Sequence, residues 1–320
     1  MPAIVTLTLN PALDIATSTD RVRPTHKLRC AEPRREPGGG GINVARVVQA
    51  LGGEVTAIFP CGGAAGATIE KLLRDSGVPV APVPIAGATR ESFTVDETDT
   101  GEQYRFVLPG PTLGDGEVEQ LLEAVAGIGA AYVVVSGSLP PGCDPKIFHR
   151  LCALCSRSGA RLVIDTSGKA LTALEGGCAY LIKPSLRELQ ELVGREFASE
   201  AEECAAAREL VARGFAEVVV VSLAERGALL VTEGIELRLP AIEVPNGSAV
   251  GAGDSMVAAL TLALAQGEHL EEALLYGIAA GAAALTAPGN ELARREDVER
   301  LYATACTRRG ASTSSTQKRP

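Results

Sequence analysis

Apolar and polar residues follow two different patterns along the chain of 320 residues. From about residue 115 onward, short runs that are continuously apolar, such as Tyr132–Ser136 and Val218–Ser222, alternate with longer segments of helical spacing. Continuously apolar strands between amphipathic helices are typical of a parallel sheet that is covered on both faces. The pattern therefore predicts an α/β fold with three layers, α/β/α, and a mostly parallel central sheet. The predicted strands are 4–9, 56–59, 132–136, 161–165, 180–182 and 218–222, and the predicted helices are 42–51, 67–75, 117–125, 145–156, 186–192, 200–212, 252–265 and 270–285.

Two polar, β-prone segments interrupt this pattern, roughly residues 16–37 and 91–109. We interpret them as a small β-sheet that stands off the main domain and forms a lid. The remaining chain is expected to be one domain, residues 1–306. Residues 307–320 are polar, rich in Ser and Thr and without apolar periodicity, so we expect a disordered tail.

Each apolar strand of the second half ends in a residue that can bind a ligand or carry chemistry: Ser136, Asp165, Lys183 and Ser222. Ligands of open parallel sheets bind at the carboxyl ends of the strands. A strand that leaves the core must also end in something polar, so this agreement alone does not identify a site.

The composition excludes several classes of function. The net charge is −9, and the terminal residues 307–320 contribute four bases and no acid, so the rest of the chain is more acidic still. Nucleic-acid binding needs a cationic face, which such a chain does not offer, although a small anionic substrate needs only a local basic pocket. The longest apolar stretch, 273–287, is shorter than the roughly 18 residues of a membrane span. No signal peptide is recognisable, so we expect a cytoplasmic protein.

The eight cysteines include one C-x-x-C pair, Cys152 and Cys155, inside an apolar segment of helical character. No second pair lies at zinc-finger spacing, and the chain has only three His. We expect buried, reduced thiols, with a redox or metal role as the alternative.

The turn Gly251-Ala252-Gly253-Asp254 stands before a helical run. Small residues at a helix start leave backbone N–H groups accessible, and the helix dipole favours an anion there, such as a phosphoryl group in transfer. Asp254 beside this cradle is a candidate general base for a hydroxyl. The alternative is a tight turn with an acid in the first helical turn, where acids are favoured anyway.

Four consecutive glycines, Gly38–Gly41, precede Asn43 at the start of another predicted helix. The stretch lacks the Lys-Ser/Thr of a P-loop and the spacing of a dinucleotide-binding loop. Glycines let a ligand approach the backbone closely, and Asn43 can bond sugar hydroxyls. A hinge between sheet and helix is the structural alternative.

Three basic residues, Lys27, Arg29 and Arg90, fall in or beside the two lid segments. They are candidate ligands for a substrate phosphate, and solvated surface charge is the alternative. After the strand that ends before Lys183, Ser185 and Glu188 have the spacing of a capping box. The functional interpretation places Glu188 near phosphates as a water-mediated ligand of Mg²⁺.

Together these segments resemble the PfkB (ribokinase-like) carbohydrate kinases, over nearly the whole chain. The Gly-rich stretch before Asn43 and the Gly-Ala-Gly-Asp turn match the two signatures of that family. Further segments resemble its members that phosphorylate fructose 6-phosphate. The matching segments are Thr6–Asp14, Lys27–Cys30, Glu36–Arg46, Ala57–Gly63, Gly101–Gly110, Ser136–Gly142 and Val250–Met256.

The resemblance implies a ribokinase-like fold and transfer of a phosphoryl group from ATP to O1 of fructose 6-phosphate, with Asp254 as the base. It implies Mg²⁺ as cofactor, K⁺ as a further possible one, and a homodimer that forms through the lid sheets. Three groups of residues would carry this activity. The catalytic turn would be Gly251, Ala252, Gly253 and Asp254; the sugar phosphate would be bound by Asp14, Lys27, Arg29, Gly39, Gly40, Gly41, Asn43, Arg90 and Ser138; the ATP site would hold Lys183, Ser185, Glu188, Ser222, Gly227 and Gly281.

Two departures from the family pattern affect the expected cofactor sites. Ser185 replaces the Asn of the family's Asn-x-x-Glu motif, which should lower nucleotide affinity. In the loop for a monovalent cation, Ser248 and Val250 match, whereas Ala287 and Glu291 stand where close relatives carry Asn and Arg.

Alternative functions remain at this stage. A kinase of tagatose 6-phosphate or fructose 1-phosphate is the first, although such relatives usually carry Lys at the position of Gly40. A non-catalytic sugar-phosphate sensor and a dinucleotide-binding oxidoreductase are more remote alternatives.

Overall fold

The structure is a computed structural model that describes residues 4–177, 179–245, 250–287 and 291–316. Among these residues, nine strands form one large sheet in the order β13-β12-β11-β10-β9-β8-β1-β4-β5. The seven strands from β11 to β5 run parallel, and β12 and β13 are antiparallel additions at one edge. The bounds are β1 Ile4–Leu7, β4 Val55–Cys61, β5 Val80–Pro84, β8 Tyr132–Ser136, β9 Arg161–Asp165, β10 Ala179–Ile182, β11 Ala216–Ser222, β12 Ala228–Val231 and β13 Glu236–Leu239.

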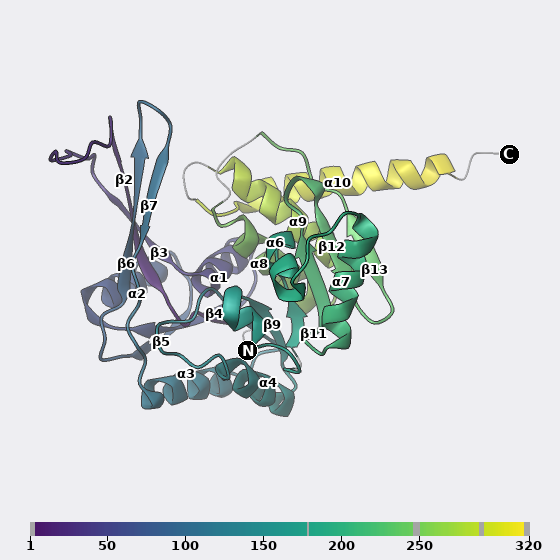
Figure 1. The fold of residues 1–320 in the computed structure, drawn as a ribbon, viewed down its shortest axis with the longest axis horizontal. Helices are drawn as coiled ribbons and strands as arrows, with labels where there is room; N and C mark the ends of the chain where they lie inside the picture. Colours follow the sequence, from purple (N-terminus) through teal and green to yellow (C-terminus); the bar gives the residue numbers. More distant parts are fainter. Residues whose placement is uncertain (1–3, 178, 246–249, 288–290, 317–320) are drawn as a thin grey trace.

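Helices cover both faces of this sheet, as the apolar pattern predicts (Figure 1). Alternate residues of a single strand belong to different cores: Val134 of β8 packs into one, and Val133 and Val135 into the other. One layer contains α1 Gly40–Ala50, α2 Gly63–Asp75, α8 Ala252–Ala265, α9 Leu270–Thr286 and α10 Arg295–Thr316. The other contains α3 Asp115–Ile128, α4 Ile147–Ser158, α5 Gly168–Thr172, α6 Leu186–Val193 and α7 Glu200–Ala212. The three-layer α/β/α architecture is therefore confirmed.

A second sheet of four strands, in the order β3-β2-β6-β7, extends from one side of the body (Figure 1). Its strands are β2 Ala12–Thr19, β3 Arg34–Gly38, β6 Arg90–Glu97 and β7 Gln103–Val107. The small sheet thus lies in the two segments predicted to form a lid, although β2 begins four residues earlier than the predicted boundary.

The structure also contains elements that the sequence did not predict, among them the short helix α5. β12 and β13 were not predicted, because both are short and β13 alternates with charged residues at an exposed edge. The terminal helix α10 continues to Thr316, into the segment expected to be disordered, because no proline interrupts it before that point. Cys152 and Cys155 are buried on α4, as predicted, whereas Cys30 and Cys306 are exposed, so the expectation of buried thiols is wrong for these two.

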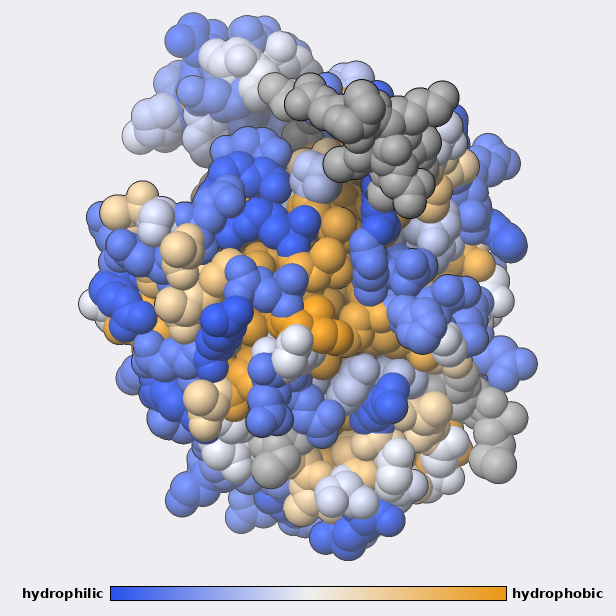
Figure 2. Space-filling view, turned by 90° about the vertical axis from the view of Figure 1, so that its right-hand side faces the viewer, coloured by the Kyte–Doolittle hydropathy of each residue, from blue (hydrophilic) through white to orange (hydrophobic). Residues whose placement is uncertain are grey.

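The surface on the side of β13 and the end of α10 is shown in Figure 2. Apolar side chains reach the surface there in a central band that polar residues border. Within the described ranges, no helix combines the length and apolarity that would be needed to cross a membrane.

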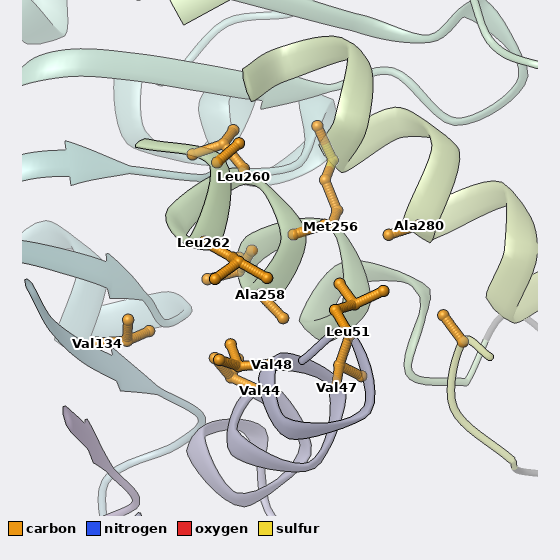
Figure 3. Close-up of a cluster of buried hydrophobic side chains, with 14 of the residues drawn as sticks. Val44, Val47, Val48, Leu51, Val134, Met256, Ala258, Leu260, Leu262 and Ala280 are labelled. Atoms are coloured by element: carbon orange, nitrogen blue, oxygen red, sulfur yellow. The ribbon is translucent and has the colours of Figure 1, made fainter. Parts of the chain in front are cut away.

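Helices α1 and α8 pack directly on one another above the sheet (Figure 3). Val44, Val47 and Val48 of α1 and Leu51, which follows its last residue, meet Ala258 and Leu262 of α8, and all six are nearly inaccessible to solvent. Burial of each such aliphatic side chain is worth about 1.5–3 kcal/mol. This contact fixes the start of α1 next to the start of α8, where the candidate site lies.

Candidate active site

The first turn of α8 begins at Gly251, which has φ 76° and ψ −2°. This left-handed conformation favours glycine, and a Cβ there would also lie 2.6 Å from Cδ2 of Leu292. No side chain caps the first N–H groups of the helix. Because these donors point out of the helix start together with its dipole, the turn can receive an anion.

Asp254 lies in this first turn and is held by two side chains from other elements. Asn43 Nδ2 of α1 donates to Oδ2 at 2.9 Å, and Ser136 Oγ at the end of β8 donates to Oδ1 at 3.2 Å. Burial and the charge of Asp165 nevertheless raise the pKa of Asp254 to about 6, against the two hydrogen bonds and Lys183, which lower it. A carboxylate with such a pKa is a stronger base than an ordinary aspartate.

The four glycines before Asn43 serve close packing of α1 against the ends of strands. A Cβ at Gly40 would lie 2.2 Å from Ser136 Oγ, and one at Gly38 would lie 2.0 Å from Asp14 Oδ2. Gly39 has φ 112°, and a Cβ at Gly41 would meet the Thr8 hydroxyl at 2.5 Å. Larger residues would push α1 away and separate Asn43 from Asp254.

A buried ion pair lies beside the same turn. Lys183 Nζ is 3.2 Å from Asp165 Oδ1, and a Cβ at Gly253 would lie 3.6 Å from that ammonium nitrogen. Burial disfavours the charged lysine, but Asp165, with Glu188 and Asp254 nearby, outweighs this effect and raises the pKa of Lys183. This raised pKa favours the charged form of Lys183 next to the turn that can receive an anion.

A pocket opens between the small sheet and the body, next to Asn43. Its polar side chains come from both parts, with the lid strands β2, β6 and β7 on one side. It is lined by Asp14, Ile15, Ala16, Glu36, Pro37, Asn43, Arg46, Thr94, Arg105, Val250 and Leu292. Burial raises the pKa of Asp14 to about 6, although Arg90 and Arg105 act in the opposite direction.

Arg90 and Ser138 are joined through Asn10, in the loop between β1 and β2. The backbone oxygen of Asn10 accepts from Nε and Nη2 of Arg90 at 3.4 and 3.2 Å. The side-chain amide of Asn10 donates to Ser138 Oγ at 3.1 Å. The structure thus brings together Arg90 and Ser138, as the sequence interpretation requires.

Lys27 and Arg29 are not part of this assembly. Both are exposed on the loop between β2 and β3, and neither lines the pocket. The expectation that they lie near Arg90 and help to bind the phosphate therefore stays a prediction.

Ser185 and Glu188 form the capping box that their spacing predicts. Glu188 Oε2 accepts from the backbone N and the hydroxyl of Ser185 at 2.7 and 2.8 Å, and Glu188 N donates back to Ser185 Oγ at 3.3 Å. Oε1 takes no part in these bonds. The structural role of the pair is thus confirmed.

The other candidates on the nucleotide side lie at the same edge of the sheet or on α9. Ser222 ends β11 and pairs with Ser185 through an isolated bridge. Gly227 has φ 93°, and a Cβ there would collide with Leu239 O. Gly281 of α9 faces the start of α8. A Cβ at this position would lie 3.4 Å from the backbone oxygen of Ala252.

The candidate cation loop is only partly described. Val250 lines the pocket, whereas Ser248 lies outside the described residues. Ala287 follows the end of α9, and Glu291 pairs with Arg294.

Three residues of the site escaped the sequence interpretation: Asn10, Arg46 and Arg105. Arg105 pairs with Thr94 across β6 and β7 and therefore points to the face that carries Asp14. The alternation of side chains along β7 could have assigned Arg105 to one face of the strand. The register of β7 with β6, which decides what Arg105 lies next to, does not follow from the sequence.

Comparison with known proteins agrees with this geometry. Residues 7–295 match the family model described as pfkB family carbohydrate kinase. The ATP-dependent 6-phosphofructokinase isozyme 2 of Mycobacterium tuberculosis is 53% identical over 94% of this chain and 89% of its own length. The isozyme 2 of Escherichia coli is 46% identical over 95% of this chain and 99% of its own.

Solved structures of phosphofructokinase-2 from Escherichia coli superpose closely. The complex with fructose-6-phosphate has a TM-score of 0.89 at 45% identity and covers 96% of this chain and all of its own. The complex with potassium has a TM-score of 0.91 at 46% identity with the same coverage. A third structure, with a TM-score of 0.89, 46% identity and again the same coverage, is the tetrameric inhibited form.

Proposed function

The chain belongs to the pfkB family of carbohydrate kinases, and from this premise we propose that it is an ATP-dependent 6-phosphofructokinase. The observation that carries the proposal is the pairing of two features at one place. The first is Asp254, a base with a pKa of about 6 beside the open helix start at Gly251. The second is the adjoining pocket, where acidic and basic side chains of the lid face the body.

In the proposed reaction the O1 hydroxyl of fructose 6-phosphate attacks the terminal phosphoryl group of ATP in line, the bond from this group to ADP breaks, and fructose 1,6-bisphosphate and ADP are formed. Asp254 accepts the hydroxyl proton, and Asn43 and Ser136 keep its carboxylate in place. The N–H groups of the α8 start and the Lys183 ammonium stabilise the charge of the group in transfer. Asp14 and Asn43 bind sugar hydroxyls, and Arg90 and Ser138 bind the phosphate.

Among the residues present, Glu188 fits a role at Mg²⁺, because one oxygen of a carboxylate that caps α6 stays outside the capping bonds. When bound, Mg²⁺ neutralises phosphate charge. Ser185, Ser222, Gly227 and Gly281 line the nucleotide side of the proposed site. A K⁺ site that includes the Val250 carbonyl stays part of the proposal, supported by the potassium complex of the Escherichia coli enzyme.

Gly40 supports fructose 6-phosphate over the substrates of related kinases. Relatives that act on fructose 1-phosphate or tagatose 6-phosphate usually carry Lys there. In this chain a Cβ at Gly40 would lie 2.2 Å from Ser136 Oγ and 2.8 Å from Gly137 N. A lysine at this position would require the end of β8 to move. Such a movement would disturb the hydrogen bond from Ser136 to Asp254.

A homodimer through the lids is the proposed assembly. The face of the small sheet opposite Asp14 carries the row Ile15, Phe93 and Phe106, and beside it Val95 and Tyr104. Phe106 is 54% exposed, and the other four side chains are half-buried. A second lid would cover this face and protect the edge strands.

The test is turnover with fructose 6-phosphate, tagatose 6-phosphate and fructose 1-phosphate in one coupled assay, with and without K⁺. We expect the highest kcat/KM for fructose 6-phosphate.

Asp254→Asn should lower kcat about 10²–10⁴-fold, the usual range for loss of a general base, and should leave sugar binding nearly unchanged. Retention of a tenth or more of the wild-type kcat would disprove the base assignment, and preference for another sugar phosphate would disprove the substrate.

A further inference from the structure

Asn10 connects the two groups that the proposed function assigns to the substrate phosphate. It lies in the loop between β1 and β2 and is only 9% exposed. Its backbone oxygen holds Arg90, and its side-chain amide holds Ser138, a residue more than a hundred positions away in the sequence. No other described residue forms hydrogen bonds with both.

The contacts of Arg90 leave a defined part of its guanidinium available. Nε and Nη2 donate to Asn10 O, and Nη1 donates to Leu108 O at 3.2 Å. A guanidinium has five N–H donors, so one donor remains on each terminal nitrogen. Two such donors can bind the oxygens of a phosphate.

Ser138 is prepared for the same ligand. Its side chain is exposed, and its oxygen accepts from Asn10 Nδ2 at 3.1 Å. Because the oxygen is already used as acceptor, the hydroxyl proton can turn to a phosphate oxygen. A second, longer contact runs from Asn10 Nδ2 to Leu139 O at 3.5 Å and fixes the same loop.

The surroundings of Asn10 are built tightly around it. A Cβ at Gly110 would lie 2.1 Å from Asn10 Oδ1, so only glycine fits at this position of the segment after β7. Asn10 Oδ1 itself is buried and has no hydrogen-bond partner within the described residues. An unsatisfied buried oxygen is costly, and its retention points to a function of the amide as a whole.

We propose that Asn10 is a positioning residue, which holds Arg90 and Ser138 in one arrangement for the phosphate group of the sugar substrate. The proposal rests on the proposed function. Its carbonyl sets the plane of the Arg90 guanidinium, and its amide sets the place of the Ser138 hydroxyl. Asn10 does not itself contact the phosphate.

The test is a double-mutant cycle of Asn10→Ala and Ser138→Ala. Asn10→Ala removes the amide and keeps the backbone oxygen. We expect the KM for fructose 6-phosphate to rise about tenfold, the effect of one hydrogen bond, while kcat and the KM for ATP stay within about threefold. The double variant should be hardly worse than the worse single variant, because both changes remove the same contact.

Additive effects in the cycle, or an equal rise of both KM values, would overturn the proposal in favour of a general structural role. Thr166→Val serves as matched control, since Thr166 Oγ1 donates to Gly137 O of the same loop at 3.0 Å without reaching Arg90 or Ser138. This control should lower the melting temperature without a selective change in the KM for the sugar. Asn10→Ser, which keeps a small donor, provides the comparison if the alanine variant does not fold.

The two hypotheses fail separately. Turnover of fructose 6-phosphate by the wild-type enzyme tests the proposed function alone. If another sugar phosphate proves to be the substrate, the same cycle is measured with that compound, and the coupling between Asn10 and Ser138 decides on the positioning role.

Discussion

At the scale of single residues, Asp254 shows how a site is made reactive at the expense of the fold. Its two hydrogen bonds favour the carboxylate, yet burial and Asp165 raise its pKa to about 6. Asn43 and Ser136 therefore keep the geometry of the base without removing its basicity. An ordinary surface aspartate, with a pKa near 3.9, would accept a proton much less readily.

This pKa has a consequence for stability that can be measured. The pKa of Asp254 is higher in the folded protein than in the unfolded chain, so the fold holds its proton more tightly. The contribution of Asp254 to the free energy of unfolding should therefore decrease as the pH rises from about 4 to above 6. Asp254→Asn removes the titration, and it should raise this free energy by about 1–3 kcal/mol at pH 8 and by much less at pH 4.

Denaturant unfolding of both proteins at the two pH values checks this prediction. Asp14 has a raised pKa as well, and it is present in both proteins, so its contribution cancels in the comparison. An Asp254→Asn variant that is less stable than the wild type at pH 8 would show that the hydrogen bonds of the carboxylate outweigh the cost of its burial, and would contradict this prediction.

The residues of the site differ in how far the sequence reveals them. Asp254 and Asn43 are recognisable because a glycine turn stands next to each of them and their chemistry is local. Asn10 and Arg105 are not recognisable in this way. Their roles depend on which distant hydroxyl lies opposite an amide, and on the register of β7 against β6.

At the scale of elements, the nucleotide side depends on a turn that is locally strained. Ala224 begins the short helix Ala224–Arg226 with φ 51°, a left-handed conformation that is costly for alanine. Neighbouring contacts must keep it in place. Arg226 in this turn donates to Glu203 of α7 at 2.8 Å, and Arg238 of β13 donates to the other oxygen of Glu203, also at 2.8 Å.

Glu203 should therefore be one of the most sensitive acidic residues outside the site. Its side chain is 6% exposed, and loss of its charge would leave two arginines without their shared partner. We expect Glu203→Gln to lower the free energy of unfolding by about 2–3 kcal/mol, less than for a fully buried pair because Arg226 is 40% exposed. The KM for ATP should rise more than the KM for the sugar.

Asp75→Asn is the matched comparison for Glu203→Gln. Asp75 pairs with Lys71 on α2, and both side chains are more than half exposed. Chemical denaturation should show a change below about 1 kcal/mol for this variant. If the two variants lose equal stability, the network of Glu203 is no more than a surface ion pair.

Elements that pack on both sides of the sheet follow from the sequence, whereas elements at its edges do not. The predicted bounds of β8 and β11 agree with the structure to within two residues, because their continuously apolar runs are stable only when they are buried. The edge strand β13 carries Glu236 and Arg238, and only its pairing with β12 makes it a strand. The lid strand β2 starts at Ala12, where the apolar pattern did not predict a strand.

At the scale of the whole molecule, the small sheet has two faces of different character. Asp14, Thr94 and Arg105 point to the pocket, whereas Phe93, Phe106 and Tyr104 lie on the opposite face. Nothing in the described part of the body covers Phe106, since the sheet extends away from the body (Figure 1). A second copy of the lid is the partner that we propose for this face.

The assembly is tested by Phe106→Ser in analytical ultracentrifugation at micromolar concentration. The wild type should sediment as a dimer or larger, and the variant should dissociate at protein concentrations at least tenfold higher, because an aromatic side chain at the centre of an interface contributes about 2 kcal/mol or more. Ile235→Ser is the control, since Ile235 is 47% exposed on the turn between β12 and β13, far from the lid in Figure 1. A monomeric wild type, or an equal effect of both substitutions, would contradict pairing through the lids. If the dimer forms as proposed, Phe106→Ser should also raise the KM for fructose 6-phosphate, because the same strand carries Arg105 into the pocket.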